Sequence, residues 1–320
     1  MRSGRLGLPV LLLALASLAA SYRPSLAFEP QFAVNTTPGV TTGLLLGANP
    51  LPGLYYVNIA YAGQSTFVGG GASTGLTGFK SDTFTEAPIV LWSTPWTVLG
   101  ASWAMLGVAP ATWVDVFDGH VPIGRAVGFH NPGFSPALLS WNLGGAWFGK
   151  LGVLFWAPIG TTAPGPFNNG LGNIGAPYWT IEPQAAISHF GPEWNFTANL
   201  IYGISTRNTD SHVINGNSLN LDVMAAKKFG NFEIGPVGYF SMQTTADSGC
   251  EAFYGPGVCA RGSKAGVGGL VGFNFGFATL RIAVTDSVYI KNSTDGWHAW
   301  STLTFDLWRD TPPPSAVRTK

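Results

Sequence analysis

The sequence predicts an all-β fold: an antiparallel transmembrane β-barrel of about twelve strands with both termini on the periplasmic side. Charged residues make up only 10% of the chain, against roughly 25% in soluble globular proteins. No apolar run after the first twenty residues reaches the roughly 20 residues that a membrane-spanning helix needs. Period-2 alternation recurs between connections that are alternately long and short, as in outer-membrane barrels. A large soluble β-sandwich is the alternative.

Residues 1–27 have the features of an export signal. Arg2 and Arg5 provide a positive start, and the apolar stretch that follows is too short to span a bilayer. A small-x-small cleavage motif ends at Ala27, with a competing one at Ala20. We therefore predict a cleaved signal peptide and a location in the outer membrane of a Gram-negative bacterium. The chain has no excess of basic residues, so we expect no nucleic-acid partner.

Residues 28–53 are rich in proline and glycine and show no sustained period. They form either a periplasmic lead-in to the barrel or a plug inside its lumen. The plug is attractive because Leu44, Leu45 and Leu46 would prefer burial to water. The sequence leaves both alternatives open.

Residues 54–308 are expected to form the barrel, and residues 309–320 a flexible C-terminal tail. The predicted strands are 54–62, 84–92, 97–109, 137–148, 151–158, 178–189, 194–205, 218–228, 232–243, 264–274, 277–290 and 297–308. The predicted longer connections are 63–83, 110–136, 159–177, 206–217, 244–263 and 291–296. Tight turns such as Gly230-Asn231 join the other strand ends.

The strand faces predict apolar side chains toward lipid and polar side chains toward the lumen. The four strands within 84–109 and 137–158 fit this less well. There, large apolar residues fall on the parity expected to face inward: Trp103, Met105, Leu138, Leu154 and Trp156. Either a bulge shifts the phase of the strand, or that wall of the lumen is apolar, which would suit a hydrophobic substrate.

Nine polar residues are predicted to line a substrate path through the lumen: Glu86, Asn142, Glu182, Gln184, Asn195, Asp222, Glu233, Arg281 and Tyr289. Because desolvated charges need partners, we expect Arg281 to pair with one or two of the inward acids. Asn142, Gln184, Asn195 and Tyr289 could hydrogen bond a hydroxylated aromatic solute. The alternative is a network of charges that only braces the lumen.

Cys250 and Cys259 are the two cysteines of the chain, and both lie in one irregular segment. In an exported protein they predict a disulfide that pins a surface loop. Asp115, Asp118 and His120 could bind a cation, but a polar loop is the simpler interpretation. No serine–histidine pair can be placed at one depth of the barrel from the sequence, and we expect neither enzymatic activity nor a cofactor or metal.

Several motifs resemble a known family. They are residues 38–43 (PGVTTG), 50–56 (PLPGLYY), 96–101 (WTVLGA), 235–239 (GPVGY) and 304–308 (TFDLW). Together they resemble the phenol-degradation MetA-pathway family of outer-membrane transporter-like proteins, over nearly all of the mature chain. Asp306 departs from the pattern, which has a proline there. The resemblance implies a non-enzymatic barrel that aids the uptake of aromatic or other hydrophobic compounds.

We therefore expect an outer-membrane channel for small hydrophobic or aromatic compounds, with outer-membrane lipid and these solutes as its partners. The alternative is a barrel without transport that has a structural role or binds other molecules through its surface loops. Substrate and oligomeric state are not specified by the sequence.

Overall fold

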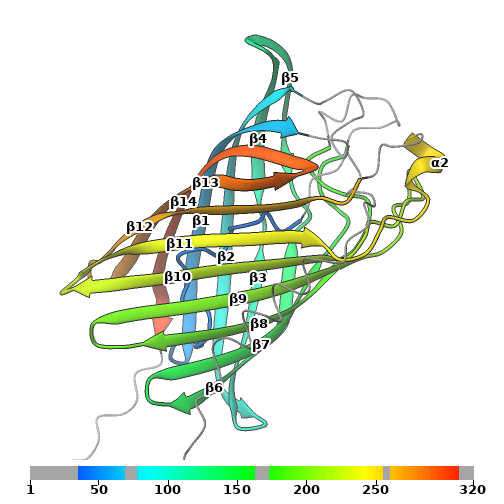
Figure 1. Cartoon of the computed structure of the whole chain (residues 1–320). Coiled ribbons are helices and arrows are strands. Elements are labelled where there is room, and N and C mark those ends of the chain that lie inside the picture. Colours follow the sequence, from blue (N-terminus) through cyan, green and yellow to red (C-terminus); the bar gives the residue numbers. More distant parts are fainter. Residues whose placement is uncertain (1–34, 69–77, 163–172, 255–259, 310–320) are drawn as a thin grey trace, which may run out of the picture.

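The computed structural model describes residues 35–68, 78–162, 173–254 and 260–309. Figure 1 shows strands that wrap around a common axis, with a short helix, α2, beside one end. The elements are β1 Gly53–Val68, β2 Lys80–Val98, β3 Ala101–Val108, β4 Ala111–Asp118, β5 Val121–Phe129, β6 Gly133–Gly144, β7 Trp147–Trp156, β8 Thr180–Phe190, β9 Trp194–Ser205, β10 Ser218–Phe229, β11 Phe232–Gln243, α2 Cys250–Tyr254, β12 Ser263–Asn274, β13 Ala278–Lys291 and β14 Ser293–Arg309. No helix among these described residues is long and apolar enough to cross a membrane.

The sheet closes on itself, because β1 pairs antiparallel with both β2 and β14. The first half of β2 pairs with β4, and its second half pairs with β3. β3 and β4 therefore occupy one position around the barrel, interrupted near Ala109 and Pro110. β5 and β6 share the next position in the same way, pairing with β4 and β3 respectively. The fourteen described strand segments thus build the predicted antiparallel barrel of twelve strands, which is confirmed, whereas the periplasmic position of both termini stays a prediction.

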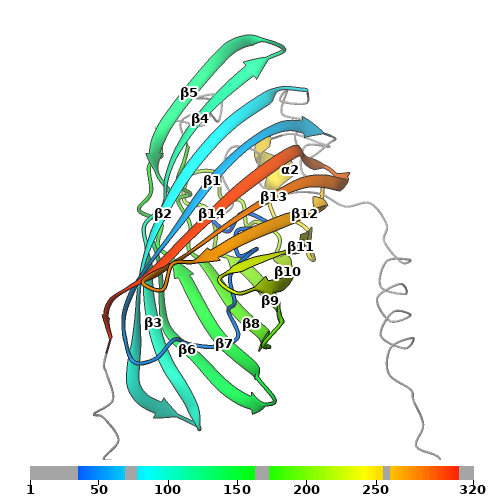
Figure 2. The same ribbon diagram turned by 90° about the vertical axis from the view of Figure 1, so that its left-hand side faces the viewer.

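Short turns lie at one end of the barrel and longer connections at the other. We call these the short-turn end and the long-loop end. The β10–β11 turn falls at the predicted Gly230-Asn231, where the φ of 64° at Gly230 suits glycine. The expected turn after residue 92 is wrong, since β2 continues to Val98 and turns at Leu99-Gly100. The expected loop 110–136 is also wrong: its residues form the β4–β5 hairpin, which stands above the neighbouring strands (Figure 2).

The outer face of the barrel is apolar. Side chains such as Phe84, Leu151, Ile187 and Ile282 are between 41% and 55% exposed, which suits contact with lipid chains. The inner face mixes polar and apolar groups, since Glu182 and Asp222 are buried there alongside an apolar cluster that includes Trp156, Leu270 and Trp300.

Both explanations offered for the irregular strands are correct in part. Leu138 and Trp156 are buried on the inner face, and Leu154 packs against the same apolar cluster, so this wall of the lumen is apolar. Trp103 lies on the opposite face from the fully buried Ala104, and its indole donates to the exposed Pro136 carbonyl. A register shift in the β3–β6 ladder accompanies this change of phase.

Candidate functional site in the lumen

The segment 35–52, which precedes β1, lies inside the ring of strands, where it is drawn in dark blue in Figures 1 and 2. Its first part is held by two buried carboxylates. The Thr36 hydroxyl donates to Glu182 Oε2 at 2.6 Å. The backbone N–H groups of Gly39 and Thr41 donate to Asp222 at 3.1 and 2.9 Å. These three hydrogen bonds attach the first part of the segment to the inner wall.

The second part of the segment follows the wall toward the short-turn end. The Gly47 N–H donates to Ser188 Oγ at 2.8 Å, and its carbonyl accepts from the Ser140 hydroxyl at 2.7 Å. A Cβ on Gly47 would lie 2.5 Å from the Ser188 nitrogen, so only glycine permits this approach. The Asn49 amide then donates to the carbonyl oxygens of Leu138 and Ser102.

Apolar contacts complete the seating of the segment. Val40, Leu44 and Leu45 pack against the cluster of buried apolar residues on the inner wall. The Cδ1 atom of Leu270 lies so close to Gly43 that a Cβ there would be 2.8 Å away. At this depth segment 35–52 therefore occupies part of the lumen and packs on an apolar region of its wall.

Six of the nine predicted lumen residues lie on the inner face: Glu182, Gln184, Asn195, Asp222, Glu233 and Arg281. Glu182 and Asp222 bind segment 35–52, as described above. The Glu182 carboxylate also accepts from the Trp156 indole at 2.8 Å. These two acids therefore serve the chain itself in this conformation.

The ion pair expected for Arg281 is formed with Glu233, whose carboxylate accepts from Arg281 Nε. The pair crosses over Gly272 of β12, which is in register with both residues. A Cβ on Gly272 would lie 2.7 Å from Glu233 Oε1, so the missing side chain leaves room for the contact. Asn195 Nδ2 also donates to Glu233, at 2.9 Å.

The other three predicted lumen residues lie elsewhere. Glu86 is on the outer face with Phe84 and Val90, hydrogen bonded to Asn58 at 2.6 Å. Asn142 is exposed at the short-turn end, where its side chain accepts from the Gly144 N–H.

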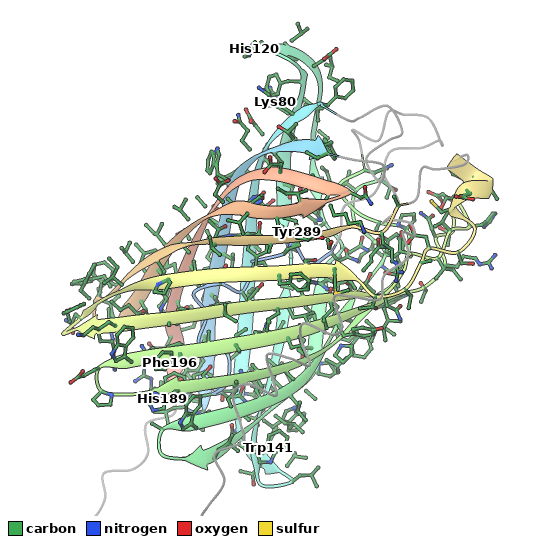
Figure 3. All side chains as sticks on the ribbon, in the orientation of Figure 1. Lys80, His120, Trp141, His189, Phe196 and Tyr289 are labelled. Atoms are coloured by element: carbon green, nitrogen blue, oxygen red, sulfur yellow. The ribbon has the colours of Figure 1, made fainter. Side chains whose placement is uncertain are left out.

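Tyr289 is 48% exposed and points outward (Figure 3). A bulge in the β12–β13 ladder sets Ala265 opposite Tyr289 but Gly266 opposite Ser287. The extra residue in β13 reverses which face of the sheet the last residues of the strand occupy. A regular alternation in the sequence cannot reveal such a reversal.

A network on the inner wall was not predicted as a site. The Tyr61 hydroxyl lies 2.8 Å from His298 Nδ1, and Lys264 Nζ lies 3.3 Å from His298 Nε2. The alternation of residues 297–308 places His298 on the polar face and was the available signal. The hydrogen bonds described above for segment 35–52 had no such signal, because they join residues that lie between 53 and 183 positions apart.

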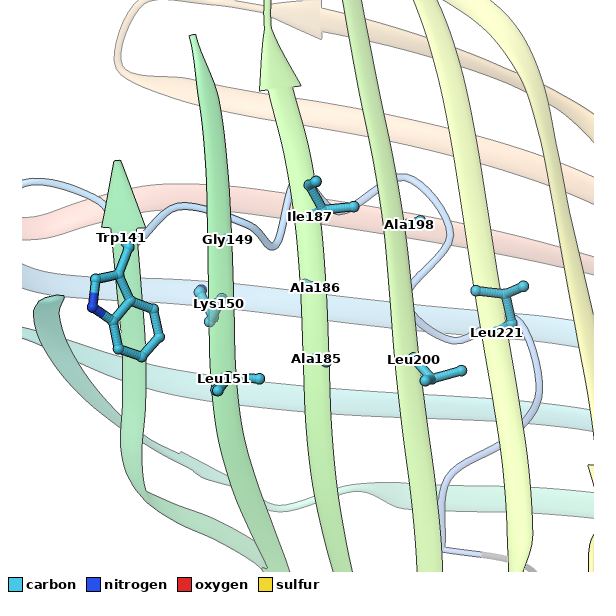
Figure 4. A pocket seen from close by; sticks show the side chains of 10 residues that line it. All are labelled: Trp141, Gly149, Lys150, Leu151, Ala185, Ala186, Ile187, Ala198, Leu200 and Leu221. Carbon is cyan, nitrogen blue, oxygen red and sulfur yellow. The ribbon is translucent and has the colours of Figure 1, made fainter. Parts of the chain in front are cut away.

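Two hollows differ in character. One of about 380 Å³ lies on the outer wall, where small residues such as Ala185 and Ala198 leave a depression between Leu151 and Ile187 (Figure 4). It faces the same side as the lipid-facing residues and does not belong to the lumen. The other, of about 340 Å³, lies inside the short-turn end and includes Glu233 and Arg281.

The remaining predicted chemistry lies outside the lumen. Cys250 is buried at the start of α2, whereas Cys259 lies outside the described residues, so the disulfide stays a prediction. The Asp115 carboxylate binds the Arg125 guanidinium at 2.6 and 3.1 Å. The described part of the chain contains no group of three or more His, Cys, Asp or Glu side chains placed to hold a metal ion.

Comparisons with known proteins agree with this fold. The profile of the family described as "Putative MetA-pathway of phenol degradation" matches residues 62–301. An outer membrane channel from Pseudomonas putida F1 is similar in structure, with a TM-score of 0.68, 14% identity, and coverage of 81% of this chain and 97% of that chain. The translocator domain of the autotransporter NalP from Neisseria meningitidis has a TM-score of 0.50 and 8% identity, with coverage of 82% and 91%. A search of curated proteins found no match. The barrel fold and the apolar outer wall together place the protein in the outer membrane.

Proposed function

Because the chain belongs to the MetA-pathway of phenol degradation family, we propose that it is an outer-membrane channel for small hydrophobic or aromatic solutes. The observation that carries the proposal is the way in which the lumen is filled. A closed barrel with a purely structural role needs no separate segment in its interior. Here segment 35–52 is attached by hydrogen bonds and side-chain packing, which can break and re-form without opening the barrel.

The chemistry of the inner wall supports the proposed class of solute. Leu138, Leu154 and Trp156 give one wall an apolar surface, while Gln184 and the Glu233–Arg281 pair add polar groups. Ligand sites for small organic molecules combine an apolar surface with a few polar groups in this way. On this proposal the short-turn end and both termini face the periplasm, and the barrel performs no catalysis.

Flux through purified protein in lipopolysaccharide-containing vesicles tests the proposal. We expect radiolabelled phenol to enter protein-containing vesicles faster than empty ones. A variant lacking residues 35–48 should increase the rate further, and Arg281→Ala should lower it. The deletion keeps every residue of the barrel, so its folding can be checked by the heat-dependent gel mobility of closed barrels.

A role in surface interaction is the second candidate, because the β4–β5 hairpin exposes Val121 and Ile123 by 63% and 42%. Absence of phenol flux in both the full chain and the deletion variant would refute the channel and favour this role.

A further inference from the structure

The cavity of about 340 Å³ inside the short-turn end is lined by the ends of six barrel strands, β8 to β13, and by Leu45 of segment 35–52. Its floor includes Gly230 and Asn231 of the β10–β11 turn, and Asn274 at the end of β12. Its volume falls within the range of roughly 300–1,000 Å³ that is typical of sites for small organic ligands. The cavity lies beyond the filled part of the lumen, where a solute would leave the barrel.

The charged side chains that line this cavity do not balance. They are Lys228, Glu233 and Arg281, two cations and one carboxylate. Glu233 is engaged by Arg281 Nε and by Asn195 Nδ2. Lys228 is the register partner of Glu233 on β10, but among the described residues no carboxylate oxygen lies within 4.0 Å of its ammonium group. One positive charge therefore remains for a ligand.

A hydrogen-bond acceptor also remains in the lining. Asn195 is 5% exposed, and its Oδ1 atom is buried with no hydrogen-bond donor among the residues that the structure describes. The amide cannot be flipped to remedy this, because its Nδ2 donates to the Glu233 carboxylate and a flip would set two acceptors against each other. A buried acceptor without a donor is costly, so a hydroxyl group on a ligand would gain by meeting it.

The lining also has an apolar part, beside the polar side chains of Asn231, Asn274 and Thr279. Leu45 and Phe190 supply an aliphatic and an aromatic surface, and the ring of Phe190 packs edge-on against that of Phe148, with the ring centroids 5.4 Å apart. A flat apolar body would bury its faces here.

From these groups we propose that the cavity binds hydroxylated aromatic monocarboxylates. The carboxylate would meet Lys228 and the terminal nitrogens of Arg281, since guanidinium groups suit planar carboxylates. The ring would lie on Leu45 and Phe190, and the hydroxyl would donate to Asn195 Oδ1. This inference rests on the proposed channel function and narrows its solute class at the exit.

Isothermal titration calorimetry of the purified full chain with 4-hydroxybenzoate tests the site. We expect Lys228→Gln to weaken binding by about tenfold to a hundredfold, because it removes a charge-assisted contact. Lys228→Arg should restore most of the affinity. Lys227→Gln is the matched control, because Lys227 instead lies over the Trp194 and Phe229 rings, 5.9 and 5.5 Å from their centroids. It should bind as the unmodified chain does.

Two ligand analogues separate the contacts. Phenol, which lacks the carboxylate, and benzoate, which lacks the hydroxyl, should both bind more weakly than 4-hydroxybenzoate. Equal affinities for Lys228→Gln and Lys227→Gln, phenol binding as tight as that of 4-hydroxybenzoate, or no binding at millimolar ligand would each overturn the proposal. Intact phenol flux alongside such a result would leave the channel function standing, whereas absent flux would remove both.

Discussion

Asp222 holds segment 35–52 in the lumen through three hydrogen bonds, and its replacement by asparagine tests how the lumen is closed. Oδ1 accepts from the Gly39 N–H at 3.1 Å, while Oδ2 accepts from the Thr41 N–H at 2.9 Å and from its hydroxyl at 2.5 Å. In Asp222→Asn the amide oxygen can keep the contact with Gly39. The new NH₂ group then faces the Thr41 N–H, so two donors oppose each other.

The cost of this change can be estimated bond by bond. A hydrogen bond to a charged group contributes roughly 1.5–3 kcal/mol. The variant loses one of the three hydrogen bonds, and the other two are no longer made to a charged group. We therefore expect the bound position of segment 35–52 to be less stable by about 3 kcal/mol. At 1.36 kcal/mol per factor of ten, this is an increase of about two powers of ten in the ratio of displaced to seated segment.

Hydrogen exchange with mass spectrometry measures that ratio directly. Protection of the amides of residues 39–44 should fall by about a hundredfold in Asp222→Asn, and solute flux should rise with it. Asp210→Asn makes the same chemical change in an exposed loop and serves as the control. If residues 39–44 exchange equally slowly in both variants, Asp222 does not hold the segment and our reasoning about the lumen is wrong.

Three further predictions follow from packing and covalent structure. Gly272→Ala should destabilise the barrel, by about 2–3 kcal/mol, because its Cβ would meet Glu233 Oε1 at 2.7 Å. Gly269→Ala is the control, because the nearest atom to its added Cβ would be 4.0 Å away. Similar urea midpoints of unfolding for these two variants would contradict our account of the ion pair. Leu270→Ala should lower the free energy of unfolding by about 2–5 kcal/mol, since Leu270 is 1% exposed. An unchanged urea midpoint would contradict this and show that the residues around Gly43 move in to fill the space. Mass spectrometry without reductant should show a peptide joining Cys250 and Cys259, lighter by two hydrogen atoms than its reduced form; free thiols at both positions would disprove the disulfide.

The barrel was predictable from the sequence because its signals are local. Alternation defines the faces of a strand such as β9, and the Gly230-Asn231 turn has the residues that a tight turn requires. The same locality explains the errors. The β4–β5 hairpin lies in the predicted loop 110–136, and its second strand contains Pro122, Gly124 and Gly128, residue types that are depleted in strands. Tyr289 follows a bulge, which reverses parity without any residue type that marks it.

The candidate site was predictable only in part, because parity identifies a face but not a partner. It placed Glu182, Asp222 and Arg281 on the inner wall, and charge alone predicted that Arg281 meets an acid. It could not distinguish an acid that faces a solute from one that binds the chain itself. That distinction depends on where residues 35–52 lie, which is decided by contacts between distant parts of the chain.

The anchors of segment 35–52 also bear on the order of assembly. They come from β3, β6, β8 and β10, which lie in one continuous arc of the sheet, β3-β6-β7-β8-β9-β10. Although residues 35–52 precede every described strand in the sequence, one of their anchors, Asp222 on β10, lies 183 positions further along the chain. The segment therefore cannot take up its full set of contacts until β10 has joined this arc.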